Sequence, residues 1–165
     1  MDADFRDMMA SFPTGVSVVA AQDGDAGPRG MTCSALCSLS VNPASLLVSL
    51  RTESPTLRAV LSSGAFAVNL LRGDSEWVAA LFASGAPDRF DRVLWRPTSH
   101  TRSPALVEAA HAVGDCTVDR TFPAGDHTIV VGGVRAIDRF STGSALVYGF
   151  WKYGQWGRTP SATVG

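Results

Sequence analysis

Short apolar segments recur along this chain without a β-α-β rhythm, and this pattern constrains the fold most strongly. Segments such as residues 16–20 and 45–51 are rich in aliphatic side chains, and turn-forming residues separate them from their neighbours. Parallel strands need long crossover connections, usually helices, so the pattern favours antiparallel pairing. We therefore predict a mainly β protein, an antiparallel barrel of six or seven strands with short capping helices.

The positions of the individual elements follow from the spacing of apolar residues and from residues that start, stop or bend helices and strands. Ser54 followed by Pro55 is a favoured helix start, and Asp2 or Asp4 is expected to cap a first helix. Gly132 and Gly133 lie inside a strand pattern and predict a bulge. The expected helices cover residues 2–11, 54–64 and a stretch from Ser75. The expected strands cover 16–20, 45–51, 65–71, 115–122, 127–138 and 145–153, with a short strand or helix at 105–109. Residues 84–104 are expected to form a loop, and 123–126 a turn.

Length and charge bound the class of protein. A chain of 165 residues fits one domain, here expected to span residues 1–165 with a core at about 5–153 and a loose tail at 154–165. Fourteen basic and 15 acidic residues give a net charge of −1, which argues against nucleic acid as the main partner. We expect no secretory signal, because the first residues lack a basic region followed by an apolar run, and no apolar run is long enough to cross a bilayer.

The cysteines and the missing motifs narrow the chemistry further. Three cysteines are an odd number, and free thiols are typical of a cytoplasmic protein. Cys33 and Cys37 have no histidine near them in sequence, so we interpret them as small packing residues rather than metal ligands. The dinucleotide fingerprint, the P-loop, the nucleophile elbow and the zinc-protease motif are all absent. A nucleotide must therefore bind on a different architecture.

Two segments combine the chemistry of a cofactor site. Residues 30–40 carry mostly small and hydroxyl side chains, which would let a flat ring lie against the backbone. Residues 49–56 run from a strand end into a helix start, with hydroxyls and Arg51 beside it, which is typical of a phosphate site. A tightly packed strand and an ordinary capped helix are the alternative interpretations. His127 follows Gly125 and Asp126, and a bond to Asp126 is the structural alternative to a functional role.

The order of these motifs resembles a known family. Residues 12–16 read Phe-Pro-Thr-Gly-Val, residues 66–71 read Phe-Ala-Val-Asn-Leu-Leu, and residues 125–127 read Gly-Asp-His. With the small-residue segment and Pro43, they resemble the short flavin reductases that serve two-component flavin-dependent monooxygenases. The resemblance covers about residues 5–153. It implies a split β-barrel of Greek-key connectivity. It also implies an NAD(P)H:flavin oxidoreductase that uses FAD or FMN with NADH or NADPH, forms a homodimer, and passes reduced flavin to a partner monooxygenase.

The resemblance also implies roles for individual residues. His127 would lie beside the nicotinamide and help to place it, and Tyr148 would support the dinucleotide. The residues expected to contact the flavin ring and ribityl chain are Thr32, Cys33, Ser34 and Ala35, with Cys37 and Ser38 near the reactive edge. Those expected at the phosphate end are Ser49, Leu50, Arg51, Ser54 and Thr56, and further contacts are expected from Asn69, Leu70, Arg89 and Phe90. Two departures stand near the end of the chain: Ala145 is found where the family often has Pro, and Trp151-Lys152-Tyr153 replaces the family's Gly-Arg-Tyr.

The implied mechanism is hydride transfer between stacked nicotinamide and flavin rings. The cofactors carry this chemistry, so His127 is interpreted as a positioning group rather than an acid. Two other functions remain open at this stage. One is a non-catalytic split-barrel flavin-binding protein, and the other is an oxidase of the pyridoxamine-phosphate type.

Overall fold

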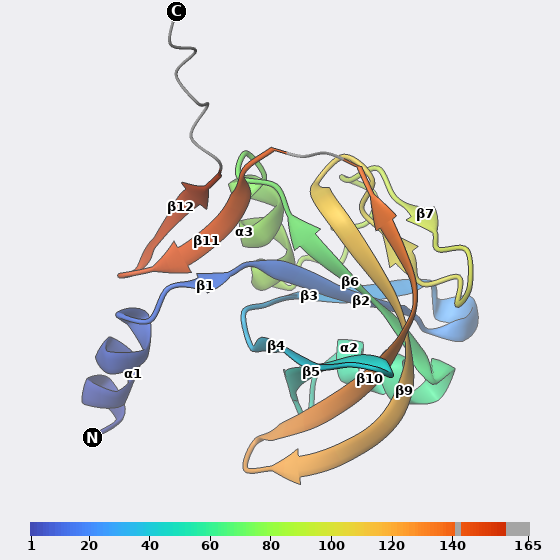
Figure 1. Ribbon diagram of the computed structural model, residues 1–165, viewed down its shortest axis with the longest axis horizontal. Coiled ribbons are helices and arrows are strands. Elements are labelled where there is room, and N and C mark those ends of the chain that lie inside the picture. The colour runs from blue at the N-terminus through green and yellow to red at the C-terminus, as the bar shows by residue number, and fades with distance from the viewer. Residues whose placement is uncertain (141–142, 158–165) are drawn as a thin grey trace, which may run out of the picture.

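Seven strands form one antiparallel sheet in the computed structural model, which describes residues 1–140 and 143–157 (Figure 1). The strand order is β3-β2-β6-β9-β10-β5-β4. The strands are β2 (Ser17–Gln22), β3 (Pro28–Cys33), β4 (Leu36–Val41), β5 (Ala44–Arg51), β6 (Ala65–Leu71), β9 (Ala110–Ala124) and β10 (His127–Arg139). The mainly β, antiparallel prediction is confirmed.

The two edge strands of this sheet are neighbours in sequence. β3 ends at Cys33 and β4 begins at Leu36, so only Ser34 and Ala35 join the two edges. A link of two residues spans about 7 Å, so the sheet must curl until its edges meet. The result is the predicted split barrel, and the split lies at Ser34 and Ala35.

Smaller elements complete the fold around the barrel. A three-stranded sheet is ordered β1-β11-β12, and β7 pairs with β8. These strands are β1 (Thr14–Gly15), β7 (Arg96–Pro97), β8 (Pro104–Ala105), β11 (Ala145–Gly149) and β12 (Lys152–Trp156). The helices are α1 (Asp2–Ala10), α2 (Pro55–Ser63) and α3 (Glu76–Ser84), with a short 3-10 turn, η1 (Gly24–Ala26). None of the described helices is long and apolar enough to span a bilayer.

β2 shows how the core is built on both faces of the sheet. Val19 and Ala21 point into the barrel with Phe66 of β6, whereas Val18 and Ala20 pack under α3. Successive side chains of a strand alternate between faces, so burial on both sides makes β2 a continuous apolar run. This explains why residues 16–20 are identifiable as a strand from sequence.

Local signals placed α2 and the bulge correctly. The Ser54 hydroxyl accepts a hydrogen bond from the amide of Leu57 at 3.0 Å, and Gly64 ends the helix in the left-handed conformation. The β9–β10 register shifts between Val131 and Gly132, as the paired glycines predicted. A Cβ on Gly132 would lie 2.4 Å from the Phe66 ring, so only glycine fits there.

Other boundaries differ from the predictions. Residues 145–153 form a hairpin, not one strand, because the chain reverses at Phe150 and Trp151; Gly154 to Trp156 therefore belong to β12 rather than to a loose tail. Residues 158–165 of that tail lie outside the described residues.

Three smaller boundary predictions were also wrong. α1 begins at Asp2 with Met1 as its N-cap residue, so Asp2 and Asp4 lie in the first turn, where carboxylates favour the helix dipole, and do not cap it. Pro123 and Ala124 extend β9 instead of forming a turn, because they pair with Thr128 and His127 of β10. The expected loop at 84–104 contains β7 and the start of β8, whose residues pair Arg96 with Ala105 and Pro97 with Pro104.

α1 stands apart from the barrel and buries none of its residues (Figure 1). Its tether is the hairpin tip, where the Phe150 amide donates to the carbonyl of Ala10. Four large apolar side chains of this segment are 45–65% exposed: Phe5, Met8, Met9 and Phe12. Such a face is unfavourable in water unless another surface covers it.

Candidate functional site

The Ser34–Ala35 link is held by one backbone and one side-chain hydrogen bond from the strands beside it. The amide of Ser49 donates to the Ala35 carbonyl at 3.0 Å, and the Ser17 hydroxyl donates to the Cys33 carbonyl at 2.7 Å. Cys33 is buried, while Ser34 and Ala35 are exposed. The split of the barrel therefore presents a small hydroxyl and a methyl on a fixed backbone.

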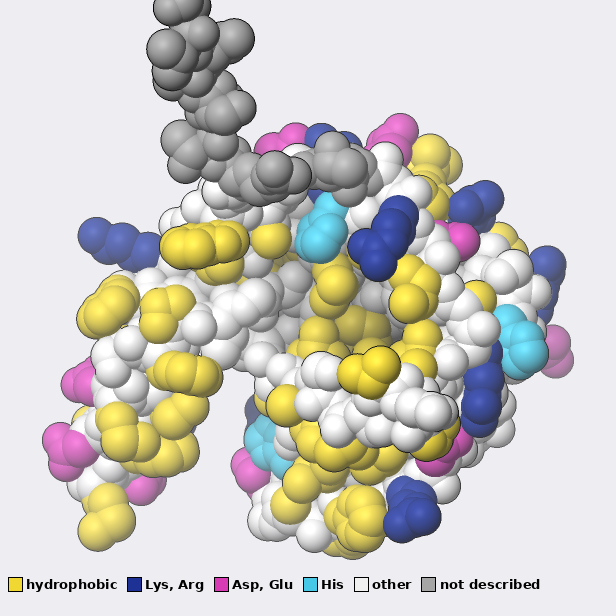
Figure 2. Space-filling view, viewed as in Figure 1, with side chains coloured by type: hydrophobic (Ala, Val, Ile, Leu, Met, Phe, Trp, Pro, Cys, Tyr) yellow, Lys and Arg dark blue, Asp and Glu magenta, His cyan; other side chains and the backbone are white. Residues whose placement is uncertain are grey.

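A cavity of about 760 Å³ opens over this link, between the barrel, α1 and the β11–β12 hairpin. Figure 2 shows an open hollow between α1 and the barrel, with hydrophobic side chains gathered on its α1 side. Among the predicted site residues, its walls contain Ser34, Ala35, Cys37, Ser49 and Tyr148. The remaining wall residues are Phe5, Arg6, Met9, Ala10, Phe12, Thr14, Leu36, Leu47, Ala124, Ile129 and Trp151. The walls are thus mainly apolar, with a few hydroxyls on the barrel side.

A smaller cavity of about 250 Å³ adjoins the first one. Thr14, Ser34 and Leu36 line both cavities, so the Ser34 side chain stands at their junction. His111 lines the smaller cavity, where burial and then the charge of Arg139 lower the pKa of its imidazole. This histidine is therefore neutral at neutral pH.

The predicted phosphate segment continues from the cavity wall along β5. Ser49 and Arg51 lie on one face of the strand, and Leu50 between them is fully buried on the other. Two residues of strand span about 7 Å, so Arg51 lies about that far from Ser49, and its carbonyl accepts a hydrogen bond from the amide of Ser54, the residue before α2. Thr56 is buried in the first turn of α2, and Ser54 caps the helix.

His127 starts β10 directly opposite Arg51 of β5. Its Nδ1 lies 2.8 Å from the carboxylate of Asp126, and this hydrogen bond lowers the pKa of Asp126. The sequence alternative, a bond between His127 and Asp126, is therefore present, and it leaves a half-buried imidazole next to Arg51.

Several predicted site residues lie elsewhere, in the protein core. Asn69 is fully buried; its amide donates to the carbonyls of Val18 and Pro104 and accepts from the amide of Leu106. Phe90 packs edge-on against Phe82 and Trp95. None of Leu50, Asn69, Arg89 and Phe90 lines the two cavities.

Other predicted site residues form hydrogen bonds within the protein or lie just beyond the main cavity. The Thr32 hydroxyl donates to the carbonyl of Ala79 on α3, and the Arg89 guanidinium donates to the carbonyl of Ala86. Burial raises the pKa of the Cys33 thiol to about 11. Leu70 lines the smaller cavity, and Ser38 is an exposed residue of β4.

A cavity of small, hydroxyl and aromatic residues at the split of the barrel has the shape and lining of a small-molecule site. The family model described as "Flavin reductase like domain" matches residues 9–157. The chain belongs to the flavin reductase family. The predictions of the family and of an NAD(P)H-dependent flavin reductase are confirmed.

Individual relatives agree with this family. A flavin reductase (NADH) from Kitasatospora aureofaciens is 42% identical over 158 residues, which is 94% of this chain and 83% of the relative. The reductase subunit of a flavin-dependent monooxygenase from Mycobacterium tuberculosis is 35% identical, over 81% of this chain and 70% of the relative. An NADH:FAD oxidoreductase from Streptomyces globisporus, solved with NAD and FAD fragments, superposes with a TM-score of 0.88 at 28% identity, covering 98% and 94% of the two chains. The predicted cofactors, a flavin and a nicotinamide dinucleotide, are confirmed.

The sequence prediction missed the walls that α1 and the hairpin tip supply. The apolar spacing of Phe5, Met9 and Phe12 was visible in the sequence, but nothing local indicates that this helix faces the split. In the sequence, Trp151 is visible only as a departure from the family's pattern. Both walls are set by long-range packing, which a local pattern does not report.

Proposed function

We propose that this flavin reductase is a homodimer that reduces a freely exchanging flavin and supplies it to a separate monooxygenase. The observation that carries the proposal is the cavity at the barrel split. Its volume of about 760 Å³ lies within the usual range for small-molecule sites, roughly 300–1,000 Å³, and leaves room for two stacked rings. A volume of this size argues against a site for one small anion.

The residues around the cavity fit a flavin. The side chains of Ser34, Ala35 and Cys37 are small, so a planar ring fits against this wall of the cavity without steric conflict. Ser49 continues this wall toward Arg51, whose guanidinium suits a phosphate beside the N-terminus of α2. The same chemistry does not discriminate FAD from FMN, so the proposal covers both flavins.

The bound flavin supplies the redox chemistry by accepting hydride from the nicotinamide. The protein's part is orientation, because holding two rings in contact removes much of the entropic barrier. The Cys33 thiol, with its pKa raised to about 11, stays neutral and is a poor nucleophile at neutral pH. The barrel side of the cavity offers small hydroxyl and methyl groups, from Ser34, Ala35 and Ser49, which supports a flavin that binds without a covalent bond and exchanges.

His127 is proposed to help place the dinucleotide. The carboxylate of Asp126 fixes one ring nitrogen of His127, which restricts the orientation of the imidazole. Ala124 and Ile129, close to His127 on the same hairpin, line the cavity. The imidazole is therefore near enough to contact a ligand that extends out of the cavity.

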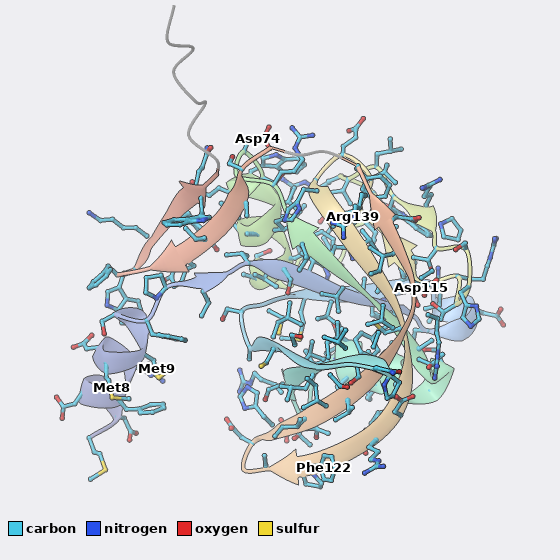
Figure 3. The ribbon with its side chains drawn as sticks, in the orientation of Figure 1. Met8, Met9, Asp74, Asp115, Phe122 and Arg139 are labelled. Atoms are coloured by element: carbon cyan, nitrogen blue, oxygen red, sulfur yellow. The ribbon has the colours of Figure 1, made fainter. Side chains whose placement is uncertain are left out.

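A second copy of the chain is proposed to cover the exposed apolar side chains of α1, and those that also line the cavity, Phe5, Met9 and Phe12, would then form a wall shared by the cofactor site and the interface. An isolated helix of nine residues is marginal in water, and this one buries nothing within its own chain. Figure 3 labels Met8 and Met9 on this helix and Phe122 near the end of the β9–β10 hairpin, and all three side chains are exposed. A second copy brings the same apolar surfaces, which makes mutual burial favourable.

Light scattering is expected to give twice the chain mass of 17.4 kDa. Met8→Glu places a charge on the face without altering a cavity residue and is expected to shift the protein toward monomer. Asp4→Gln, on the same helix, is the matched control and is expected to remain dimeric. A wild-type mass of one chain contradicts the dimer.

A turnover panel tests the activity itself. NADH or NADPH is mixed with excess FAD, FMN or riboflavin, and absorbance at the nicotinamide band is followed. Rapid loss of this absorbance with at least one pair is expected, and no loss with any pair would reject the reductase activity.

In the same assay, His127→Ala is expected to raise the KM for the dinucleotide about tenfold, with a smaller change in the KM for flavin.

The partner and the location complete the proposal. The relative that is the reductase subunit of a monooxygenase supports a partner oxygenase, reached by diffusion of reduced flavin. Cys33, Cys37 and Cys116 are free thiols, which supports a cytoplasmic location.

A further inference from the structure

The tip of the β11–β12 hairpin has an unusual combination of residue type and backbone conformation. Gly149 pairs with Lys152, so Phe150 and Trp151 alone form the turn. Both residues have positive φ, 50° and 62° respectively. Two-residue turns of this kind strongly favour Asn-Gly, because a bulky side chain is strained there.

Burial within the chain does not explain why two large aromatic residues occupy these positions. Phe150 is 65% exposed and Trp151 is 59% exposed. The tip is nevertheless fixed in place, since the Phe150 amide bonds to the Ala10 carbonyl and Gly149 packs closely on Pro13. Strained residues that gain little packing energy are typical of functional sites.

The two aromatic residues differ in their surroundings. Trp151 lines the main cavity, across from the wall formed by Ser34, Ala35 and Cys37, and it also lines a second cavity with Arg6. Phe150 lines neither cavity. The turn therefore presents one indole ring to the space in which the cofactors are proposed to bind.

We propose that Trp151 contacts a planar heteroaromatic ring of a cofactor bound in this cavity, and that the strained turn is retained to present its indole. This inference rests on the proposed function, because it assumes that a flavin or a dinucleotide occupies the cavity. An indole offers a large, rigid surface for ring stacking at little cost in conformational entropy. The isoalloxazine of the flavin and the rings of the dinucleotide share this chemistry, and separate titrations distinguish them.

The test compares Trp151→Asn with the matched control Phe150→Asn. Asparagine tolerates positive φ, so each variant is expected to raise Tm by roughly 2–4 °C in the apo protein. Binding is measured directly, by titration with riboflavin, FAD and NAD⁺. Trp151→Asn is expected to weaken at least one of these probes about five- to tenfold, whereas Phe150→Asn leaves all three unchanged.

A third variant, Trp151→Phe, keeps an aromatic ring and is expected to retain most of the affinity. The riboflavin arm reports contact with the isoalloxazine, and the NAD⁺ arm reports contact with the dinucleotide. Equal affinities in Trp151→Asn and Phe150→Asn for every probe overturn the proposal. Conversion of Trp151→Asn alone to a monomer also overturns it, because the lost affinity then follows from the lost interface rather than from a lost ring contact. Failure of the turnover panel rejects the reductase activity but leaves these binding results interpretable.

Discussion

Replacing Asp115 with alanine is expected to lower the free energy of unfolding by about 3 kcal/mol, since several donors to one buried carboxylate are left unpaired. Asp115 lies on β9 and is only 2% exposed. Its carboxylate accepts from the amides of His100 and Thr101 at 2.9 and 3.1 Å, and from the Thr101 hydroxyl. Asp115, which is labelled in Figure 3, therefore holds the turn between β7 and β8 against the barrel.

Urea and thermal unfolding measure this effect, with an expected fall in Tm of roughly 6–12 °C for a chain of this size. Asp119→Ala is the matched control on the same strand. Asp119 is a half-exposed partner of Arg135, and exposed ion pairs contribute about 1 kcal/mol or less. A loss no larger than that of the control contradicts the structural role of Asp115. Neither residue lines the two cavities at the split, so cofactor KM values are expected to stay near those of the wild type.

The Asp115 contacts illustrate what the sequence did not predict. Residues 84–104 were expected to form a loop, and the bonds that order part of it come from a carboxylate on a distant strand. By contrast, α2 was predicted from Ser54, Pro55 and Gly64, because a cap, a first-turn proline and a terminal glycine act locally. Long-range side-chain bonds leave no comparable local signal.

The hairpin at residues 145–156 shows a different limit. A turn is recognised in sequence by residues that tolerate its dihedral angles, and Phe150 and Trp151 are among the least suited. The prediction therefore ran one strand through the turn. Where a local rule fails in this way, a functional or strained site is the usual reason.

The candidate site was predicted in part because the family resemblance and the chemistry of small residues agreed. Ser34, Ala35, Cys37 and Ser49 do meet at one cavity, on the β3–β4 link and on the strands β4 and β5 beside it. Asn69 was implied by the same resemblance, yet its amide is fully used inside the core. Residue type alone does not tell a ligand contact from a core hydrogen bond.

Replacing Ser34 with tyrosine is expected to reduce kcat/KM for flavin reduction by roughly 100-fold, because a displaced ring loses its reactive alignment. Ser34 lines both cavities at the split, so a tyrosine ring there fills the space that the isoalloxazine needs. The residue is exposed, so the added volume does not overpack the core, and Tm is expected to change by less than about 2 °C. Stopped-flow measurement of NADH oxidation, together with thermal unfolding, checks both expectations.

Two further variants separate loss of space from loss of the hydroxyl. Ser34→Ala keeps the cavity open and is expected to cost only about fivefold, the size of one neutral hydrogen bond. Ser62→Tyr adds the same ring to an exposed position of α2 and is expected to leave turnover unchanged. If Ser34→Tyr turns over like Ser62→Tyr, the ring does not bind at the split, and the two-residue link that closes the barrel is only structural. A large loss confined to Ser34→Tyr instead means that the connection which forces the sheet to curl also forms the floor of the cofactor site.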